Sequence, residues 1–469
     1  MKEEFKINNL NSVPRHTHYD PILHSKIQEF IITAIDLLKN RLEQRIMVPV
    51  FNEPQFDISN RKFVFKKFLP IPNFDSFITM HDADLVALPE FVSCHNYFKK
   101  SPVFRNHLRQ INGTEQNRKI NSETYSKNNY IIRILSKFLN SIGYLRFEKE
   151  LFNRLYSNME DYLFGKTMDF IAITPLKLFQ SNIRGIDFGQ KSTLSPIEIS
   201  EVRMLLKSNL VDIHRINFVL PIFALKTSFS IQKSEQIGHK LPIGEIEKII
   251  GNLRIFKRGA LSYNNIYCIP TSWEPTEASS FFVNQLVFGP PYILQDGEVD
   301  DLLFLNRVLD GLRTQNKFIE IAIERFNFAS TRRRIEDRLT DYITAIEALM
   351  LSANEKSELV YRLSLRIPAL IGKTGSEKTR IKRILKTAYA QRNCIVHGKK
   401  LKLARIDGKK YSTEDLTSAL EDYTRKTIKK FSELSSHKIN QETFLEELDD
   451  RILCFERDNI EKQNNPGEM

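Results

Sequence analysis

The sequence predicts an α+β protein of several domains, in which a helical and β-containing N-terminal region precedes an all-α helical bundle at the C-terminus. Two observations predict this fold class. A chain of 469 residues is long enough for two or three domains, each with its own core. Apolar residues recur at helical spacing near both ends of the chain, whereas the middle contains short runs that are typical of strands.

The composition excludes several classes of protein. Hydrophobic residues make up 41% and charged residues 27%, as in an ordinary globular protein. No apolar run approaches the length of a transmembrane helix, and the polar start shows no signal-peptide pattern, so we expect a cytoplasmic protein without membrane contact. The four cysteines are widely separated and form no CxxC pair, which argues against a disulfide framework or a cysteine-rich zinc site.

Residues 1–128 are predicted to form a mostly helical N-terminal region. Lys26–Ile46 has the apolar spacing of an amphipathic helix, and residues 48–70, which contain prolines, predict short strands or loops. The polar segment 112–129 predicts a linker.

Two groups in this region superficially resemble metal sites. His16, His18, Asp20 and His24 cluster near the start, but their spacing matches no known metal-site pattern. The pair His81 and Asp82 predicts the acidic first turn of a helix instead. We therefore expect no metal and no cofactor.

Residues 130–300 predict a mixed α/β, β-rich domain with a regulatory or sensing role. We expect two helices between Tyr130 and about Phe164, and another over 243–257. Ser195 and Glu198 have the spacing of a capping box at the start of a further helix. Strands are predicted at 168–174, 183–188, 216–223, 225–231, 266–269 and 281–287.

Residues 301–460 predict a bundle of antiparallel helices, followed by a disordered tail at 461–469. Ser412 and Asp415 are spaced like a capping box. The predicted helices cover roughly 302–327, 331–352, 356–372, 377–397, 412–436 and 441–457.

The most informative stretch is Tyr389–Lys400, which lies in the most basic part of the chain. Residues 371–410 contain 13 lysines and arginines and two acidic residues, a net charge of +11, whereas the whole chain carries +12. A concentrated positive patch is typical of a protein that binds a polyanion. A solvated charged surface is the alternative interpretation of the same charge run.

Arg392 stands within the apolar stripe of a predicted helix. The stripe consists of positions 381, 384, 385, 388, 392 and 395, of which only 392 is charged. Such an arginine requires an anion, an acidic partner such as Glu347, or a second subunit.

Arg392 and His397 are five residues apart, about 140° around a helix, so one straight helix does not bring them together. Asn393 and His397 share a face, together with Lys382 and Lys386 on the same side. Gly398 suits the position that ends the helix. The two side chains would therefore converge at the helix end or across a dimer axis.

Arg392-Asn393-x3-His397 resembles the R-x(4–6)-H motif of HEPN ribonuclease domains. Together with the upstream segment from Asp337 through Asp341 to Glu347, it is similar to the ApeA-like HEPN group. The resemblance covers about residues 300–435. It implies that the C-terminal bundle is of HEPN type and forms a homodimer in which the arginine and histidine of two protomers face one cleft.

The resemblance also implies metal-independent cleavage of RNA by a bacterial antiviral defence protein of the abortive-infection or toxin type. The ribose 2′-OH would attack the adjacent phosphate and leave a 2′,3′-cyclic phosphate. In this chemistry, His397 serves as general acid or base, Arg392 neutralises charge on the phosphate, and Asn393 orients His397 or the phosphate. Lys382, Lys386, Lys399 and Lys400 would bind flanking RNA phosphates.

Two alternatives remain open from the sequence. The helical domain is a non-catalytic module for nucleic-acid binding or dimerisation, in which Arg392 closes an ion pair and His397 caps its helix. Alternatively, the middle domain is catalytic, although it contains no recognisable catalytic motif. In the nuclease interpretation, the N-terminal region binds an unidentified trigger and regulates the C-terminal domain.

Overall fold

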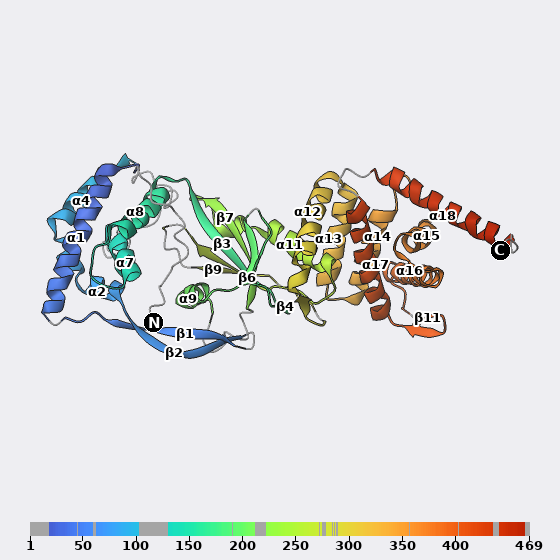
Figure 1. Cartoon of the computed structure of the whole chain (residues 1–469), viewed down its shortest axis with the longest axis horizontal. Helices are drawn as coiled ribbons and strands as arrows, with labels where there is room; N and C mark the ends of the chain where they lie inside the picture. Colours follow the sequence, from blue (N-terminus) through green and yellow to red (C-terminus); the bar gives the residue numbers. More distant parts are fainter. Residues whose placement is uncertain are drawn as a thin grey trace. The chain divides into compact units, whose positions relative to one another are not determined.

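The computed structural model has a mixed α+β fold, with sheets in the N-terminal half and mainly helices in the C-terminal region (Figure 1). At this level the predicted fold class is confirmed. The structure describes residues 18–44, 46–59, 62–102, 130–189, 191–211, 222–271, 273, 278–283, 285, 287, 289–355, 357–401, 403–434 and 440–464. The predicted linker at 112–129 and His16 lie outside these residues.

Contacts between residues divide the chain into two compact units that interleave along the sequence. The first unit comprises 1–175, 196–242 and 265–282, and the second comprises 176–195, 243–264 and 283–469. The second unit therefore takes three segments, 176–195, 243–264 and 283–300, from the region that was expected to form a middle domain.

The first unit begins with helices that share one apolar core. Helix α1 starts after Asp20, whose carboxylate accepts a hydrogen bond from the backbone N–H of Leu23 at 3.0 Å. Its buried residues, including Ile27, Phe30 and Ile31, recur at helical spacing because one face points to the core. The helices are α1 (Pro21–Glu43), α2 (Phe74–Met80), α3 (Asp82–Val86), α4 (Pro89–Lys100), α7 (Tyr130–Ile142) and α8 (Lys149–Phe164).

Residues 50–59 and 62–72 form the two strands of an antiparallel hairpin, so this segment contains strands, one of the two predicted alternatives, but they are longer than expected. Strand β1 (Val50–Ser59) pairs with β2 (Lys62–Pro72), and the register shifts between Gln55 and Phe56. In a ribbon of two strands, half of the backbone N–H groups face away from the partner strand. Prolines are tolerated at such positions, which is why they do not interrupt this hairpin.

Strands β7 (Phe223–Gln232), β3 (Thr167–Pro175), β8 (Asn265–Pro270) and β9 (Ser279–Phe282) lie side by side in this order, and each is antiparallel to its neighbour. Helix α9 (Ile199–Lys207) contributes Val202 and Leu205 to the core over these strands. The strands predicted at 168–174, 225–231 and 266–269 are confirmed. The strand predicted at 281–287 instead ends at Phe282, and most of 216–223 lies outside the described residues.

The capping box of α9 differs from the predicted one. Glu198, not Ser195, occupies the N-cap, and the Glu201 carboxylate accepts a hydrogen bond from the Glu198 backbone N–H at 2.7 Å. Ser195 belongs to β6 (Ser192–Pro196), which pairs with β5 (Ile186–Asp187). The helix starts later because Pro196 lies in a strand.

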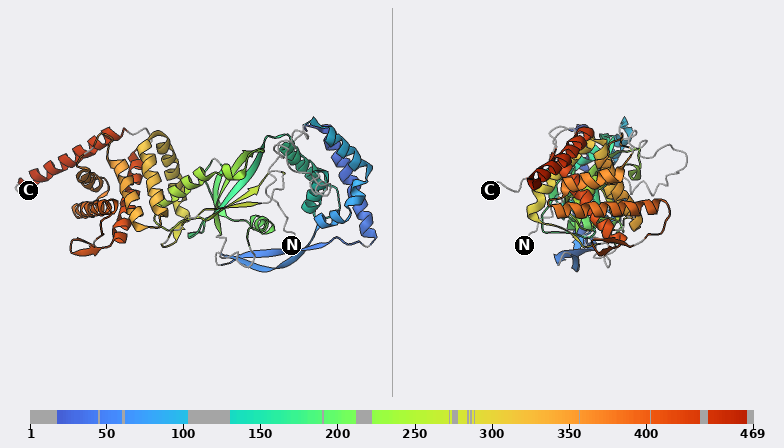
Figure 2. Two further views of the ribbon diagram at one scale, coloured as in Figure 1. Left: turned by 180° about the vertical axis from the view of Figure 1, so that it is seen from behind. Right: turned by 90° about the vertical axis from the view of Figure 1, so that its right-hand side faces the viewer.

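The second unit is built mainly of helices around one core (Figures 1 and 2). Helices α13, α14 and α17 contact one another, and α15 and α16 pack beside them. Strands β4 (Phe179–Ser181) and β10 (Tyr292–Leu294) form a parallel pair. The helices are α11 (Ile243–Phe256), α12 (Val299–Gln315), α13 (Lys317–Thr331), α14 (Ile335–Met350), α15 (Leu359–Ile371), α16 (Gly375–Val396), α17 (Thr413–Leu434) and α18 (Gln441–Asn464).

Three details of the predicted bundle need correction. The helix expected over 302–327 is two helices, because the chain turns at Asn316, whose backbone is extended (φ −133°). Strands β11 (Ala404–Ile406) and β12 (Lys409–Tyr411) form a hairpin in a region predicted to contain only helices. Helix α18 continues through residues 461–464 of the predicted tail. Among the described residues, no helix combines the length and the apolar character that a membrane span requires.

Candidate functional site

The site predicted from the sequence lies at the C-terminal end of α16. This helix begins at Thr374, whose hydroxyl accepts a hydrogen bond from the Glu377 backbone N–H at 3.2 Å. The predicted apolar stripe is confirmed, since Ile381, Ile384, Leu385 and Ala388 are buried in the core. Arg392 continues the same stripe and is half-buried.

The end of α16 is closed by a Schellman motif that places His397 at the surface. His397 is the C-cap, and Gly398 follows with a φ of +64°. The Gly398 N–H donates to the Ile395 carbonyl at 3.0 Å, and the Lys399 N–H donates to the Cys394 carbonyl at 2.8 Å. The predicted role of Gly398 is therefore confirmed. The His397 side chain is exposed and comes directly after the last helical turn.

Arg392 turns toward α14 and contacts an acidic residue there. Its Nη2 lies 3.9 Å from Oε2 of Glu347, and its Nη1 donates to Oδ1 of Asn393 at 3.3 Å. Among the described residues, its Nε has no hydrogen-bond partner. The ion pair between Arg392 and Glu347 that we considered from the sequence is present at this long distance.

Tyr389 completes this group and was not predicted as a site residue. Its hydroxyl donates to Oε1 of Glu347 at 2.9 Å, and the Arg392 guanidinium lies 5.6 Å from the centre of its ring. Burial raises the pKa of Tyr389, and the hydrogen bond to Glu347 raises it further, so the hydroxyl stays protonated. Its position three residues before Arg392 places both side chains on one face, which is the sequence signal that could have identified it.

The structure does not join Arg392 to His397 within one chain. In the part of the chain that the structure describes, no hydrogen bond or ion pair links the two side chains. Asn393 contacts His397 only through the backbone, where the His397 N–H donates to the Asn393 carbonyl at 3.1 Å. The Asn393 side chain instead accepts from Arg392.

Of the four predicted RNA-binding lysines, two lie within α16 and two follow its C-terminal end in the sequence. Lys382 is half-buried and Lys386 is exposed on α16, whereas Lys399 and Lys400 are exposed after the cap. An ion pair between Arg383 and Asp407 connects α16 to the turn between β11 and β12. One of the two acidic residues of the basic region is thus already paired.

Comparisons with protein families, with characterised proteins and with solved structures find no match to this chain.

Proposed function

We propose that this protein is a metal-independent RNA endonuclease of a bacterial defence system, with a C-terminal HEPN-type domain that the N-terminal regions regulate. The observation that carries the proposal is the exposed His397 at the cap of α16, one turn after Arg392 and followed by Lys399 and Lys400. This arrangement gives a titratable imidazole access to a ligand at the surface of the most basic segment.

The proposed reaction uses the ribose 2′-OH as the nucleophile. His397 removes its proton or protonates the leaving 5′ oxygen, and the reaction leaves a 2′,3′-cyclic phosphate and a 5′-OH. Arg392 stabilises the negative charge on the phosphate, for which the two ends of a guanidinium are well suited. Lys382, Lys386, Lys399 and Lys400 bind flanking phosphates.

The site is proposed to be completed by a second copy of the chain. Arg392 faces α14, whereas His397 lies beyond the helix end, and no contact within the described residues brings the two together. A homodimer would place the Arg392 of one protomer near the His397 of its partner, so that each cleft contains both groups.

A non-catalytic module for nucleic-acid binding or dimerisation is the second candidate. One observation favours it: Arg392 is already engaged by Glu347, Asn393 and the ring of Tyr389. In that function Arg392 stabilises the bundle and His397 caps α16, while the surrounding lysines bind nucleic acid without cleaving it.

The two candidates differ in what happens to bound RNA. The full-length protein is incubated with single-stranded RNA in EDTA, and the product termini are analysed. We expect 2′,3′-cyclic phosphate termini, with cleavage reduced by about two to four orders of magnitude in His397→Ala, because a general acid–base contributes that much. Arg392→Ala should be similarly impaired. Lys373→Ala is the matched control, since it removes an exposed cation just before α16.

Each result has a clear meaning for the proposal. Full cleavage by both alanine variants would show that the site lies elsewhere. Binding of RNA without cleavage, at the same affinity in wild type and His397→Ala, would favour the non-catalytic module.

A further inference from the structure

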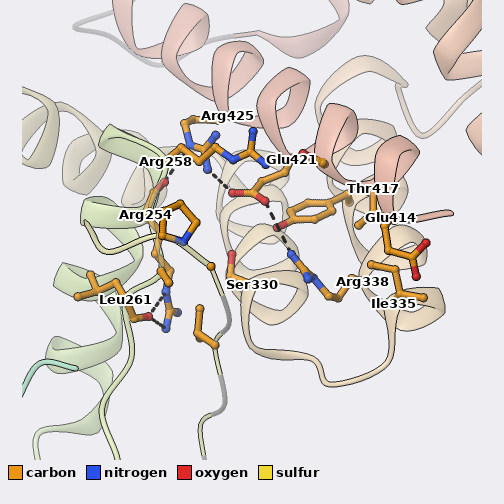
Figure 3. A pocket seen from close by; sticks show the side chains of 17 residues that line it. Arg254, Arg258, Leu261, Ser330, Ile335, Arg338, Glu414, Thr417, Glu421 and Arg425 are labelled. Carbon is orange, nitrogen blue, oxygen red and sulfur yellow. Dashed lines mark hydrogen bonds and ion pairs between the residues drawn. The ribbon is translucent and has the colours of Figure 1, made fainter. Parts of the chain in front are cut away.

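The second unit contains a cavity whose lining includes neither Arg392 nor His397. Figure 3 shows its lining side chains. Its volume is about 210 Å³, far above the ~10–15 Å³ that a cavity needs on this measure to hold one water molecule. Its walls come from the end of α11 and the segment after it, the segment before β10, the end of α13, the first turns of α14, and α17. The cavity is formed entirely within one compact unit.

The lining of the cavity is rich in arginine. It includes Arg254, Arg258, Arg338 and Arg425, against two glutamates, Glu414 and Glu421. Figure 3 shows the Glu421 carboxylate between Arg425 and Arg338. The cavity therefore carries an excess of positive charge.

Arg425 has a structural role at the wall of the cavity. Its Nη2 donates to Glu421 at 2.5 Å and its Nη1 to Asp422 at 2.8 Å. Its Nε donates to the Arg254 carbonyl at 3.0 Å. With all three nitrogens engaged, Arg425 fixes α17 against α11.

Arg254 and Arg338, in contrast, have nitrogens that the described residues do not satisfy. Arg254 is only 4% exposed; two of its nitrogens donate to the Leu261 carbonyl, and its buried Nη1 has no partner in the described part of the chain. The Nε of Arg338 is likewise buried without a partner there, and its Nη2 lies 3.7 Å from Glu421. Burial lowers the pKa of the Arg254 guanidinium because a desolvated charge is unfavourable.

Arg258 places a cation at the rim of the cavity. Its side chain is 54% exposed, and its Nη2 donates to the Ser418 hydroxyl at 2.5 Å. Its ion pair with Asp422 is long, at 3.8 Å. Arg258 therefore offers a largely exposed guanidinium at the rim, and contact with a ligand would exchange its hydrogen bond to Ser418 for one to the ligand.

The remaining lining is apolar or small. Leu261, Val287, Pro290, Ile335 and the ring of Tyr342 all face the cavity. A ligand that fits this environment has an anionic group for the arginines and an organic body for the apolar wall. An anion would satisfy the unpaired N–H groups of Arg254 and Arg338, which otherwise cost free energy in a buried position.

We propose that this cavity binds a small organic phosphate, with the phosphate group held by Arg254, Arg258 and Arg338. Phosphate fits because its oxygens can accept from several guanidinium groups at once, and Arg254 offers its unpartnered Nη1 and Arg338 its unpartnered Nε among the described residues. Tyr342 lies beside the arginines, and burial raises its pKa to about 12, so its hydroxyl remains neutral. This proposal does not rest on the proposed RNA cleavage, since none of these residues belongs to the site on α16.

The test measures binding to the full-length protein by calorimetry, with adenosine 5′-monophosphate, inorganic phosphate and adenosine as probes at up to millimolar concentration. We expect the mononucleotide to bind and adenosine to bind far more weakly. Arg338→Gln and Arg258→Gln should each weaken binding of the mononucleotide at least about tenfold, the effect of losing a hydrogen bond from a charged donor.

Arg334→Gln is the matched control, because Arg334 immediately precedes α14, is 73% exposed, and does not line the cavity. Binding should persist in Arg334→Gln and also in His397→Ala, which separates this proposal from the RNA site. Melting temperatures without ligand confirm that the variants fold. The proposal is overturned if neither phosphate-bearing probe binds, if adenosine binds as tightly as the mononucleotide, or if Arg334→Gln weakens binding as much as Arg338→Gln does.

Discussion

Among individual residues, Glu347 is the acid that would offset the positive charge of Arg392 if Arg392 binds phosphate as proposed. Its carboxylate accepts the Tyr389 hydroxyl and lies 3.9 Å from the Arg392 guanidinium. Glu347→Gln retains an oxygen that can accept from Tyr389 but removes the negative charge. Two unit charges at this distance interact by about 1 kcal/mol in a water-like medium, so we expect RNA to bind roughly fivefold more tightly.

This change in affinity is best measured by fluorescence anisotropy with single-stranded RNA, in a His397→Ala background, in which we expect cleavage to be suppressed. Glu336→Gln provides a control on the same helix, where the acid pairs with Arg334 instead. If Glu347→Gln bound RNA no more tightly than the control, Arg392 would not contact phosphate.

Substitution of Gly398 should destabilise the protein, because its φ of +64° is unfavourable for residues with a Cβ. Among the described residues beyond its immediate chain neighbours, no atom lies within 4 Å of where that Cβ would be, so we expect the cost of Gly398→Ala to be conformational. We expect a loss of about 1 kcal/mol in the free energy of unfolding, measured by chemical denaturation. Gly375→Ala, at the start of the same helix and equally uncrowded, should be neutral or slightly stabilising.

At the scale of elements, Arg366 on α15 connects three parts of the second unit. It is 2% exposed, its Nη2 lies 2.7 Å from Glu355 and 2.6 Å from Asp449 of α18, and its Nη1 donates to the Met350 carbonyl at the end of α14. Arg366→Gln removes the cation from Asp449 and from the Met350 carbonyl, and leaves Glu355 with Arg362 alone. We expect a loss of about 3 kcal/mol or more in the free energy of unfolding, as for other broken buried pairs.

Arg362 offers a matched comparison in the same cluster. It also pairs with Glu355, at 2.8 Å, but it is 37% exposed. Arg362→Gln should therefore cost no more than about 1 kcal/mol. Both variants are measured by denaturant unfolding. If they lost equal free energy of unfolding, the burial of Arg366 would not be the reason for its contribution to stability.

The sequence predicted most elements but not the breaks between them. The stripe on α16 and its stop at Gly398 follow from spacing and from the conformational freedom of glycine, which are local properties. Asn316 is different: the apolar pattern continues through it, and only the packing of two helices requires the turn there. The hairpin of β11 and β12 was missed although its turn is Asp407-Gly408, with φ values of +51° and +76°, a combination typical of tight hairpins.

The candidate site was predictable to a similar extent. The residues around Arg392 could be identified from position and charge, including the acidic partner Glu347. The direction of the Arg392 side chain could not be predicted, because it depends on Tyr389 and on the packing of α14 against α16. The contact between Tyr389 and Glu347 joins residues that are 42 positions apart in the sequence. The arginine-rich cavity was also missed, since its lining comes from separate segments between residues 254 and 425.

At the scale of the whole molecule, the two units carry different titrating groups. In the first unit, burial lowers the pKa of His24, and the neighbouring His18 lowers it further, whereas Asn153 and Glu160 oppose the shift. Lys149 also lowers it. Burial lowers the pKa of His95 in the same unit. In the second unit, the hydrogen bond from Arg366 lowers the pKa of Glu355.

These shifts predict that acid destabilises the first unit before the second. A histidine whose pKa is lowered by folding binds fewer protons when folded, so its unit loses stability as the pH falls below about 6.5, the ordinary histidine value. The stability that Glu355 contributes persists until the pH falls below about 4.3, the ordinary value for glutamate. The single tryptophan, Trp273, is buried in the core of the first unit, so its fluorescence reports on that unit.

We therefore expect the urea midpoint followed by Trp273 fluorescence to decrease between pH 7.5 and pH 5.5. His24→Gln should reduce this pH dependence, because the variant removes one of the groups that titrate in this range and retains a side chain that can hydrogen-bond Asn153. Glu355→Gln serves as the control and should leave the dependence unchanged, since Glu355 belongs to the second unit and titrates at lower pH. A midpoint that rises on acidification, or an equal pH dependence in His24→Gln and wild type, would show that His24 does not destabilise the first unit in acid.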